Sequence, residues 1–428
     1  MRRVAVVGSG ISGLGVAHEL AGEAQVTLFE AGSHFGGHTN TVDVTLDGVT
    51  HGVDTGFLVF NHRTYPNLVR LFDRLGVETA ASDMSFSVQV PATGLEWSGS
   101  DLNSVFAQRR NLLNPRFLGM LAEVMRFNRK ATALAVRGEE ASLAEPIGDF
   151  LDREGFGRPF RDWYLLPMLG CIWSCPTDQM LRFPVATMIR FCHNHGLIQV
   201  VDRPQWYTVA GGARNYVQRM LQSVPDVRLA TPVTAVRRIA GGVMVATAQG
   251  SERFDAVVLA AHSDQSLAML ADADEHERAV LGAIRYHANR AVLHTDVSLM
   301  PQRRAAWAAW NYERAASASG EEAGVCLHYW INRLQPLPWR TPVIVSLNPA
   351  RLPDPAKVLR RIDYAHPVFD LAAIEAQRRL PALQGRGGVW FAGAWTRYGF
   401  HEDGLMSALA VVRGLRERWR NDTLRAAA

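Results

Sequence analysis

Lysine is almost missing from this chain, so its positive charge is nearly all arginine. Of 45 basic Lys and Arg side chains, only Lys130 and Lys357 are lysine, and the formal net charge is +4. Arginine pairs well with phosphate, but a skew spread along the whole chain is more typical of genomic base composition than of a nucleic-acid surface. We therefore expect no nucleic-acid partner.

Cysteine is scarce as well. The four cysteines, Cys171, Cys175, Cys192 and Cys326, are scattered through 428 residues, which is the pattern of a reducing compartment rather than of a disulfide framework. Cys171 and Cys175 lie one helical turn apart. Because no second Cys or His pair follows at ligand spacing, two packed thiols explain them better than zinc does, and we expect no metal.

Long apolar runs are also lacking. No window reaches the roughly 18 uninterrupted apolar residues of a membrane-spanning helix, and glycine interrupts the short apolar stretch at the start, unlike a signal peptide. The composition, with 48% hydrophobic and 20% charged residues, is that of a packed soluble protein. We expect a cytoplasmic protein of two interleaved domains, because the chain is too long for one simple core.

The first thirty residues contain a strand, a glycine-rich turn, a helix and a second strand in that order. Apolar periodicity predicts the strands at 3–7 and 25–29 and the helix at 14–20. The turn has the pattern G-x-G-x-x-G and consists of Gly8, Ser9, Gly10, Ile11, Ser12 and Gly13. In such a turn the first glycine permits the tight bend, the second lets backbone approach a pyrophosphate, and the third lets the helix pack closely.

Glu30 ends the second strand, where a carboxylate accepts hydrogen bonds from the ribose hydroxyls of an adenosine. A glycine triplet alone would be a turn of any α/β protein. With flanking strands and this acid, the pattern predicts a dinucleotide at the helix N-terminus. An acid at this place favours FAD or NAD over NADP.

Three further blocks point to a flavin. Gly36, Gly37 and His38 follow Glu30, and Asp54, Thr55, Gly56 and Phe57 come next. Near the C-terminus a predicted strand at 389–393 leads to the run 399–404 and a predicted helix at 405–419. In these blocks the chain resembles the flavin-containing amine oxidase and carotenoid-desaturase superfamily. The resemblance implies FAD as cofactor.

The fold that the resemblance implies is α/β, with a Rossmann-like FAD-binding domain of the GR2 type interleaved with an α+β substrate domain. It assigns 1–65, 198–262 and 385–428 to FAD binding, and 66–197 and 263–384, with a helical insertion, to the substrate. In the family, backbone matching Val233 meets the adenine and the last helix points at the flavin. The residues assigned to FAD binding are Gly8, Ser9, Gly10, Ile11, Ser12, Gly13, Glu30, Ala31, Gly36, Gly37, His38, Thr39, Asp54, Thr55, Gly56, Phe57, Val233, Gly393, Ala394, His401, Glu402, Asp403, Gly404 and Leu405.

The chain departs from the family pattern at three points. His38 stands where the family has arginine near the pyrophosphate, and it either donates to phosphate or is a plain surface histidine. Ala394 replaces an acid that often follows the C-terminal glycine. No cysteine lies between Gly393 and Gly404, so we expect dissociable rather than covalent FAD.

Two features bear on the substrate. Aromatic and methionine side chains are dense in 66–197 and 263–384, which predicts an apolar, lipid-like substrate. The helical stretch 106–137 carries many arginines, interleaved apolar residues and one acid, Glu123. That stretch is either a peripheral membrane contact or a solvated basic face packed on the core.

The family's shared chemistry passes hydride from a carbon-hydrogen bond to flavin N5. Amine oxidases commonly place a lysine near N5, but the matching segment 286–290 ends in Arg290, which cannot serve as a base. The candidate catalytic residues are His401, Glu402 and Tyr398. His401 and Glu402 can shuttle protons, or Glu402 only caps the helix that follows it. Tyr398, like Trp395, either walls the substrate or only packs.

More narrowly, the chain resembles a bacterial group of predicted NAD/FAD-binding oxidoreductases associated with cyclopropane and branched fatty-acid modification. The blocks that carry this resemblance are 54–57, 330–332, 347–349 and 399–404. It implies oxidation or desaturation of a fatty-acyl chain. A flavin-dependent amine oxidase and a flavin-binding protein without catalysis stay open, and the sequence specifies neither the electron acceptor nor the oligomeric state.

Overall fold

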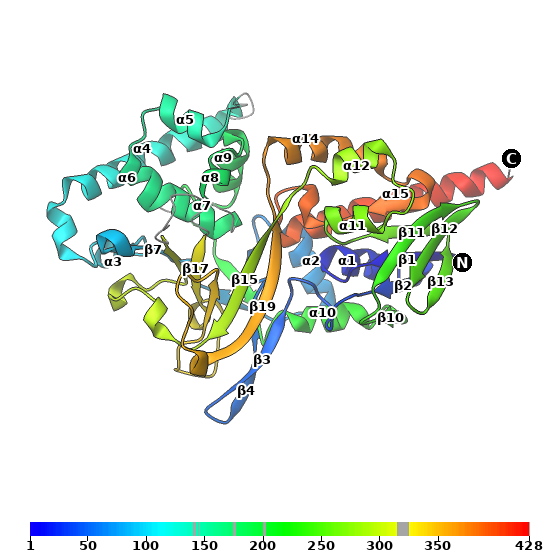
Figure 1. The fold of residues 1–428 in the computed structure, drawn as a ribbon, viewed down its shortest axis with the longest axis horizontal. Helices are drawn as coiled ribbons and strands as arrows, with labels where there is room; N and C mark the ends of the chain where they lie inside the picture. The colour runs from blue at the N-terminus through cyan, green and yellow to red at the C-terminus, as the bar shows by residue number, and fades with distance from the viewer. Residues whose placement is uncertain (140–142, 144, 174–176, 200–202, 315–324, 428) are drawn as a thin grey trace.

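The structure is a computed structural model that describes residues 1–139, 143, 145–173, 177–199, 203–314 and 325–427. Two parts lie side by side along the long axis of the molecule (Figure 1). Both termini lie at one end, in the part built on a parallel sheet. The helices α3 to α9 form the other end, above a second and larger sheet.

The first part is built on a five-stranded parallel sheet. Apolar residues of its first strand, such as Val4 and Val6, are fully buried, as expected where helices cover both faces of a parallel sheet. The strands, in their order across the sheet, are β10 (Asp226–Arg228), β2 (Ala24–Phe29), β1 (Arg2–Val7), β14 (Ala256–Leu259) and β20 (Val389–Phe391).

On one face of this sheet the helices α1 (Ile11–Leu20) and α15 (His401–Ala427) pack together. Their contact is close, because a Cβ added at Gly15 would lie 2.9 Å from the Cβ of Ala408. Three further helices share a buried core with the other face: α11 (Ser263–Met269), α12 (Glu275–Leu281) and α14 (Leu371–Arg379). The expected domain boundaries at 262/263 and 384/385 therefore fall inside this layer, since these helices bury their apolar faces on the parallel sheet.

The second part contains a seven-stranded sheet whose strands come from distant segments. Residues 86–98 supply its two last strands, and residues 286–367 supply the others. In order across the sheet the strands are β19 (Val358–Pro367), β15 (Tyr286–His294), β18 (Ile344–Leu347), β17 (Cys326–Trp330), β16 (Trp310–Glu313), β7 (Phe86–Val90) and β8 (Leu95–Ser98).

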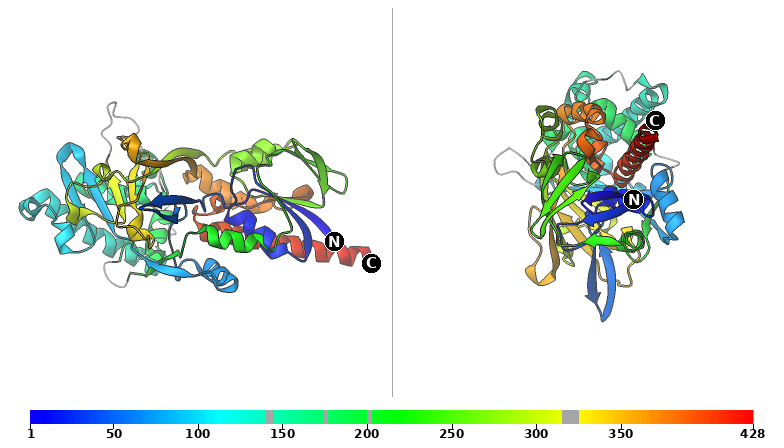
Figure 2. Two further views of the ribbon diagram at one scale, coloured as in Figure 1. Left: turned by 90° about the horizontal axis from the view of Figure 1, so that it is seen from below. Right: turned by 90° about the vertical axis from the view of Figure 1, so that its right-hand side faces the viewer.

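A helical layer, the expected insertion, covers this sheet (Figure 2). Its long helix, α4, begins after Asn114, whose side chain accepts from the amides of Arg116 and Phe117. The elements are α3 (Leu102–Val105), the 3-10 helix η2 (Arg109–Leu113), α4 (Pro115–Arg137), α5 (Ile147–Arg153), α6 (Arg158–Phe160), α7 (Leu166–Trp173), α8 (Thr177–Met180) and α9 (Val185–Asn194).

Smaller elements complete the fold. The hairpin β3–β4 projects from the molecule in Figure 1, and β5, β9 and β6 form a three-stranded sheet. These elements are β3 (Thr41–Leu46), β4 (Val49–Asp54), β5 (Phe60–Asn61), α2 (Pro66–Leu75), β6 (Thr79–Ser82), β9 (Trp206–Val209), α10 (Arg214–Leu221) and α13 (Ile331–Leu334). The strands β11 (Val233–Ile239), β12 (Gly242–Thr247) and β13 (Gly250–Phe254) form a separate sheet that shares a buried core with the parallel sheet.

Candidate active site

A single cavity of about 750 Å³ extends through both parts of the molecule. Its first end lies at the glycine turn after β1, and its far end lies among side chains of the seven-stranded sheet and of α7 and α9. A volume of this size is at the large end of the range for ligand pockets. The carboxyl ends of β1, β2 and β14 open into it, as in other parallel α/β sheets.

The glycine turn has the geometry that its pattern predicts. A Cβ at Gly13 would lie 1.8 Å from the carbonyl oxygen of Gly8, so only glycine lets α1 pack against the turn. Gly8 has φ +100°, a conformation that favours glycine. An added Cβ at Gly10 would meet nothing within 4 Å, because Gly10 faces the cavity. Space for a phosphate thus lies against free backbone of the turn and the start of α1.

Glu30 lies in the wall at the same end of the cavity. One carboxylate oxygen accepts from the amide and hydroxyl of Ser9, at 2.9 Å and 2.5 Å, and the other accepts from the amide of Gly32 at 2.7 Å. These bonds fix the carboxylate beside the glycine turn. Glu30 remains the predicted partner of the adenosine ribose.

The predicted cofactor residues divide into two groups. Those that line the cavity are Gly8, Ser9, Gly10, Ile11, Ser12, Glu30, Ala31, Gly36, His38, Thr55, Gly56, Phe57, Val233, Gly393, Ala394 and His401. Those that lie behind its wall are Gly13, Gly37, Thr39, Asp54, Glu402, Asp403, Gly404 and Leu405.

Asp54 was expected beside the flavin, and the structure places it away from the cavity. Its carboxylate accepts from the hydroxyl of Thr41 at 2.5 Å and from the amide of Ala213 at 2.9 Å. Ala213 is the N-cap residue of α10, so Asp54 anchors that helix to the β3–β4 hairpin. Burial raises the pKa of Asp54 to about 7.

Glu402 is also turned away from the cavity, which corrects both of its expected roles. Its carboxylate accepts from the backbone amides of Asn67 and Leu68, each at 3.0 Å, and from the Asn67 side chain. It therefore caps α2, a helix that lies more than 300 residues earlier in the chain, and not α15, to which it belongs. With both oxygens bonded to α2, Glu402 is no longer a candidate proton shuttle.

The neighbours of Glu402 hold the start of α15 in place. Asp403 accepts from the backbone amide of Phe400 at 3.0 Å, and burial raises the pKa of its carboxyl to about 6. Gly404 crosses the first turn of α1, where its carbonyl accepts from the hydroxyl of Ser12 at 3.0 Å. Leu405 is buried in the core between the helices. These contacts position His401 at the cavity wall.

His38 lies in the cavity wall, so the alternative of a plain surface histidine is wrong. Its ring stacks on Tyr364 with centroids 4.9 Å apart. Its Nε2 is shielded from solvent and has no hydrogen-bond partner within the part of the chain that the structure describes. A buried polar atom without a partner indicates a group that a ligand satisfies.

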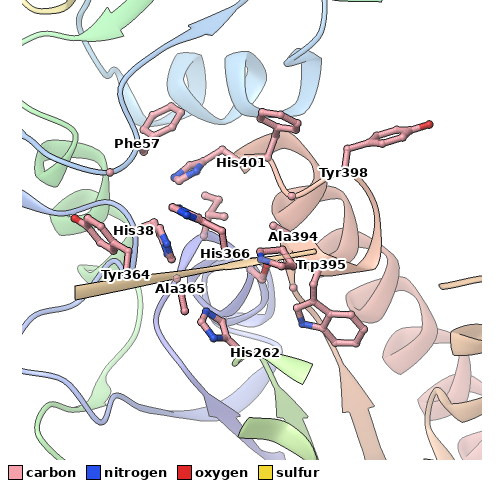
Figure 3. A pocket seen from close by; sticks show the side chains of 18 of the residues that line it. His38, Phe57, His262, Tyr364, Ala365, His366, Ala394, Trp395, Tyr398 and His401 are labelled. Atoms are coloured by element: carbon pink, nitrogen blue, oxygen red, sulfur yellow. The ribbon is translucent and has the colours of Figure 1, made fainter. Parts of the chain in front are cut away.

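Three more histidines, His262, His366 and His401, line the same stretch of cavity. Figure 3 shows the rings of His38, His366 and His401 gathered together, with Phe57 and Tyr364 beside them. Burial lowers the pKa of His366 to about 4 and that of His401 to about 3. All three gathered rings are therefore neutral at physiological pH, because burial also holds the pKa of His38 well below its usual value.

His401 is bonded on its protein side. Its Nε2 lies 2.9 Å from the hydroxyl of Thr39 and 3.0 Å from that of Tyr216, and its ring stacks on Phe57 at 3.7 Å. A histidine with so low a pKa is a poor proton acceptor at neutral pH. The geometry favours a hydrogen-bonding and positioning role over the predicted proton shuttle.

Tyr398 and Trp395 both line the cavity, but they differ in surroundings. The indole Nε1 of Trp395 donates to the carbonyl of Ala261 at 3.1 Å, and its ring is buried. Tyr398 lies at the rim, and its ring points away from the gathered histidines in Figure 3. The side chain of Trp395 is therefore the more firmly held of the two lining residues.

The far end of the cavity is apolar. The side chains there come from six elements, and among the described residues that line the whole cavity Glu30 is the single Asp, Glu, Lys or Arg. The aromatic and aliphatic residues at this end include Phe86, Met168, Ile172, Trp173, Phe191, Trp310, Tyr329, Val345 and Leu347.

Arg290 does not lie at the place predicted for it. Its side chain is 65% exposed, pairs with Asp363 at 3.6 Å and does not line the cavity. The two lysines of the chain are also remote: Lys130 pairs with Glu154 and Lys357 with Asp296. No lysine is available for the role that the family's amine oxidases give to one.

Several residues that line the cavity were not predicted from the sequence. His262 follows β14, and the rule that ligands bind at the carboxyl ends of parallel strands could have found it. Tyr364 and His366 alternate along β19, a period of two that indicates one face of a strand. Their nearness to His38 depends on tertiary packing, for which no local pattern exists.

The residues present fit FAD. The cavity offers an acid for a ribose, open backbone amides for a diphosphate, and the unpartnered Nε2 of His38, all along one wall. A parallel sheet, a glycine turn and a closing C-terminal helix together define a dinucleotide-binding fold. The interleaved substrate part distinguishes it from a simple nucleotide domain.

Comparison with known proteins assigns the chain to a family. A sequence model of flavin containing amine oxidoreductases matches residues 11–300. The chain therefore belongs to the flavin containing amine oxidoreductase family, and FAD is its cofactor. Membership makes it an oxidoreductase.

One curated relative and two solved structures illustrate the range of this fold. The (S)-6-hydroxynicotine oxidase of Paenarthrobacter nicotinovorans is 25% identical over 59% of this chain, and the match spans only 57% of that protein. The CLA-producing fatty acid isomerase from P. acnes superposes with a TM-score of 0.68 at 16% identity, covering 96% of this chain and 98% of the isomerase. Cyclohexylamine oxidase from Brevibacterium oxydans gives 0.64 at 17%, with 97% and 99% covered. At such identities the structural matches show the fold alone.

Proposed function

We propose that this chain oxidises or desaturates an apolar, fatty-acyl substrate by removing hydride from one of its carbon-hydrogen bonds. The observation that carries the proposal is the continuous cavity, which joins the predicted FAD site to an apolar end without a charged side chain among its described lining residues. An acyl chain would bury methylene groups there, each contributing about 0.8 kcal/mol.

Bound FAD supplies the hydride acceptor for such a reaction. The chain's own contribution is to hold the substrate and exclude water. Phe86 of β7 and Leu347 of β18, from the seven-stranded sheet, and Met168 of α7 line the apolar end. An aliphatic chain held among them is separated from bulk water, which keeps the reacting carbon in one place.

The gathered histidines lie between the two ends of the cavity. Because their pKa values are low, they offer neutral rings that donate or accept hydrogen bonds without adding charge. His366 Nδ1 accepts from the side-chain Nδ2 of Asn289 at 2.8 Å, which leaves the ring proton on Nε2. This donor and the free Nε2 of His38 serve to orient bound groups.

Amine oxidation is the second candidate, and the hydroxynicotine oxidase relative supports it. A protonated amine gains from a carboxylate or from aromatic faces. The far end offers aromatic faces, such as those of Trp310 and Tyr329, but no acid among the described lining residues. The lining therefore favours the acyl substrate.

Anaerobic reduction of the flavin tests the proposal. Purified holoprotein is mixed without oxygen with fatty-acyl esters and phospholipids in one series, and with aliphatic and aromatic amines in another. Loss of the oxidised flavin absorbance with acyl compounds is the expected result. Reduction by amines alone would transfer the assignment to the second candidate.

A further inference from the structure

The outer face of α4 has an unusual composition. Leu118, Ala122, Met125, Arg129 and Val136 fall within about 40° of one line along the helix, at 100° per residue. The exposed fractions of Leu118, Met125 and Val136 are 42%, 55% and 70%. A surface helix ordinarily presents polar residues on this side, so an apolar ridge here needs an explanation.

The opposite face of α4 is well packed, which fixes the direction of the ridge. Phe117, Met120, Phe127 and Ala131 are each no more than 1% exposed. Phe127 contacts the rings of Phe156 and Phe160 beneath the helix. The helix therefore cannot turn its ridge inward without opening this core.

The segments that precede α4 in the chain also expose apolar side chains. Leu113 is 89% exposed and Leu112 is 49% exposed, both in η2, which contacts α4. Leu102 of α3 is 79% exposed. Figures 1 and 2 place α3 and α4 at the end of the molecule that is remote from both termini.

The charge of this surface is positive and largely unpaired. Arg109, Arg110 and Arg129 are exposed, and none of them forms an ion pair with any residue that the structure describes. The acid of α4, Glu123, lies on another side of the helix, where it accepts from the amide of Gly157 at 3.0 Å. Apolar side chains beside unpaired arginines match an anionic bilayer, whose headgroups attract the cations while its acyl region receives the apolar groups.

We propose that the surface formed by α3, η2 and α4 docks this protein on an anionic phospholipid bilayer. A docked enzyme would take its acyl chains from the membrane itself. Only this identity of the substrate rests on the proposed function; the docking does not. No helix within the described ranges is long and apolar enough to cross a bilayer, so the contact is peripheral.

Vesicle flotation of the full-length, FAD-loaded protein tests the docking. One set of vesicles is phosphatidylcholine alone, and the other adds about one third phosphatidylglycerol. We expect flotation with the anionic vesicles at low salt, and much less with phosphatidylcholine or at high salt, since salt screens the arginines. Failure to float with anionic vesicles at low salt would overturn the proposal.

Two variants locate the contact. Leu113→Ser with Leu118→Ser and Met125→Ser removes apolar groups, and Arg110→Gln with Arg129→Gln removes charge; all five side chains are exposed, so folding and flavin content should persist. At about 1 kcal/mol for each arginine near an anionic surface, the charge variant should bind roughly 20-fold or more weakly.

Matched controls change the same chemistry elsewhere. Leu352→Ser with Leu371→Ser alters exposed apolar residues, and Arg360→Gln with Arg361→Gln alters exposed arginines of β19. Both controls should float like the wild type. If the controls lose flotation as strongly as the α4 variants, the assigned surface is wrong. Flotation does not depend on flavin reduction. The protein can therefore float with anionic vesicles even if acyl compounds do not reduce the flavin, and acyl compounds can reduce the flavin even if the protein does not float.

Discussion

The two ends of the cavity are built in opposite ways. At the FAD end, Gly8, Gly10 and Gly13 lie within six residues, and the backbone conformation of this short segment forms the site. At the apolar end, side chains from six elements converge, and residues as distant in sequence as Phe86 and Leu347 line one cavity only because the seven-stranded sheet brings their strands together. A site formed by the backbone of one short segment can be predicted from that segment, whereas a site formed by side chains from distant segments cannot.

The largest expected effect comes from Gly13→Ala, at the FAD end. The new Cβ would lie 1.8 Å from the Gly8 carbonyl oxygen, so α1 and the turn must separate. We expect loss of bound FAD and a low yield of folded protein, measured by the ratio of flavin to protein after purification. Gly119→Ala on α4, where an added Cβ meets nothing within 4 Å, is the control. A fully loaded Gly13→Ala protein would contradict the close packing.

Glu30→Gln tests the same end of the cavity by removing a charge while keeping the size of the side chain. Hydrogen bonds to a charged group contribute about 1.5–3 kcal/mol, so FAD should bind roughly 10- to 100-fold more weakly. Titration of the apoprotein with FAD measures the change, and thermal melting without FAD shows how much is lost through the bonds to Ser9 and Gly32. Glu375→Gln, whose side chain is 60% exposed on α14, should bind FAD normally. Equal FAD affinity in both variants would remove Glu30 from the cofactor site.

Met168→Gln should affect the apolar end of the cavity and leave the FAD end unchanged. It places an amide among apolar lining residues at little change in volume, and an unpaired amide there costs about 1–3 kcal/mol in acyl binding. We expect the apparent Kd for an acyl substrate to rise about 5- to 100-fold while FAD affinity stays unchanged. Leu352→Gln, on an exposed residue, should alter neither. A loss of FAD affinity with acyl binding intact would reverse the assignment of the two ends.

The smallest expected effect is that of Glu402→Gln. Glutamine keeps one acceptor for the amides of α2 but loses the charge, so the free energy of unfolding should fall by about 1 kcal/mol and Tm by about 2 °C. The anaerobic rate of flavin reduction should match that of the wild type. A slower reduction at unchanged Tm would restore Glu402 to the chemistry.

The same contrast explains what could be predicted from the sequence. The βαβ unit with its glycine turn appears at the expected residues, since local periodicity and turn chemistry determine it. Glu402 and Asp54 were assigned to the flavin by family position, yet each caps a helix distant in sequence, and such partners depend on the complete fold. Arg290 was placed near the flavin by its spacing from Tyr286, but β15 turns it outward to Asp363. His366 went unnoticed because nothing local links it to His38.

The central claim, that one cavity presents an apolar chain to FAD, is tested most directly by a series of acyl substrates of increasing length. Anaerobic flavin reduction is measured as a function of substrate concentration for each length. At about 0.8 kcal/mol for each buried methylene, the apparent affinity should rise about fourfold per added carbon until the apolar end is filled. An affinity independent of chain length, or reduction by amines and by no acyl compound, would contradict the account.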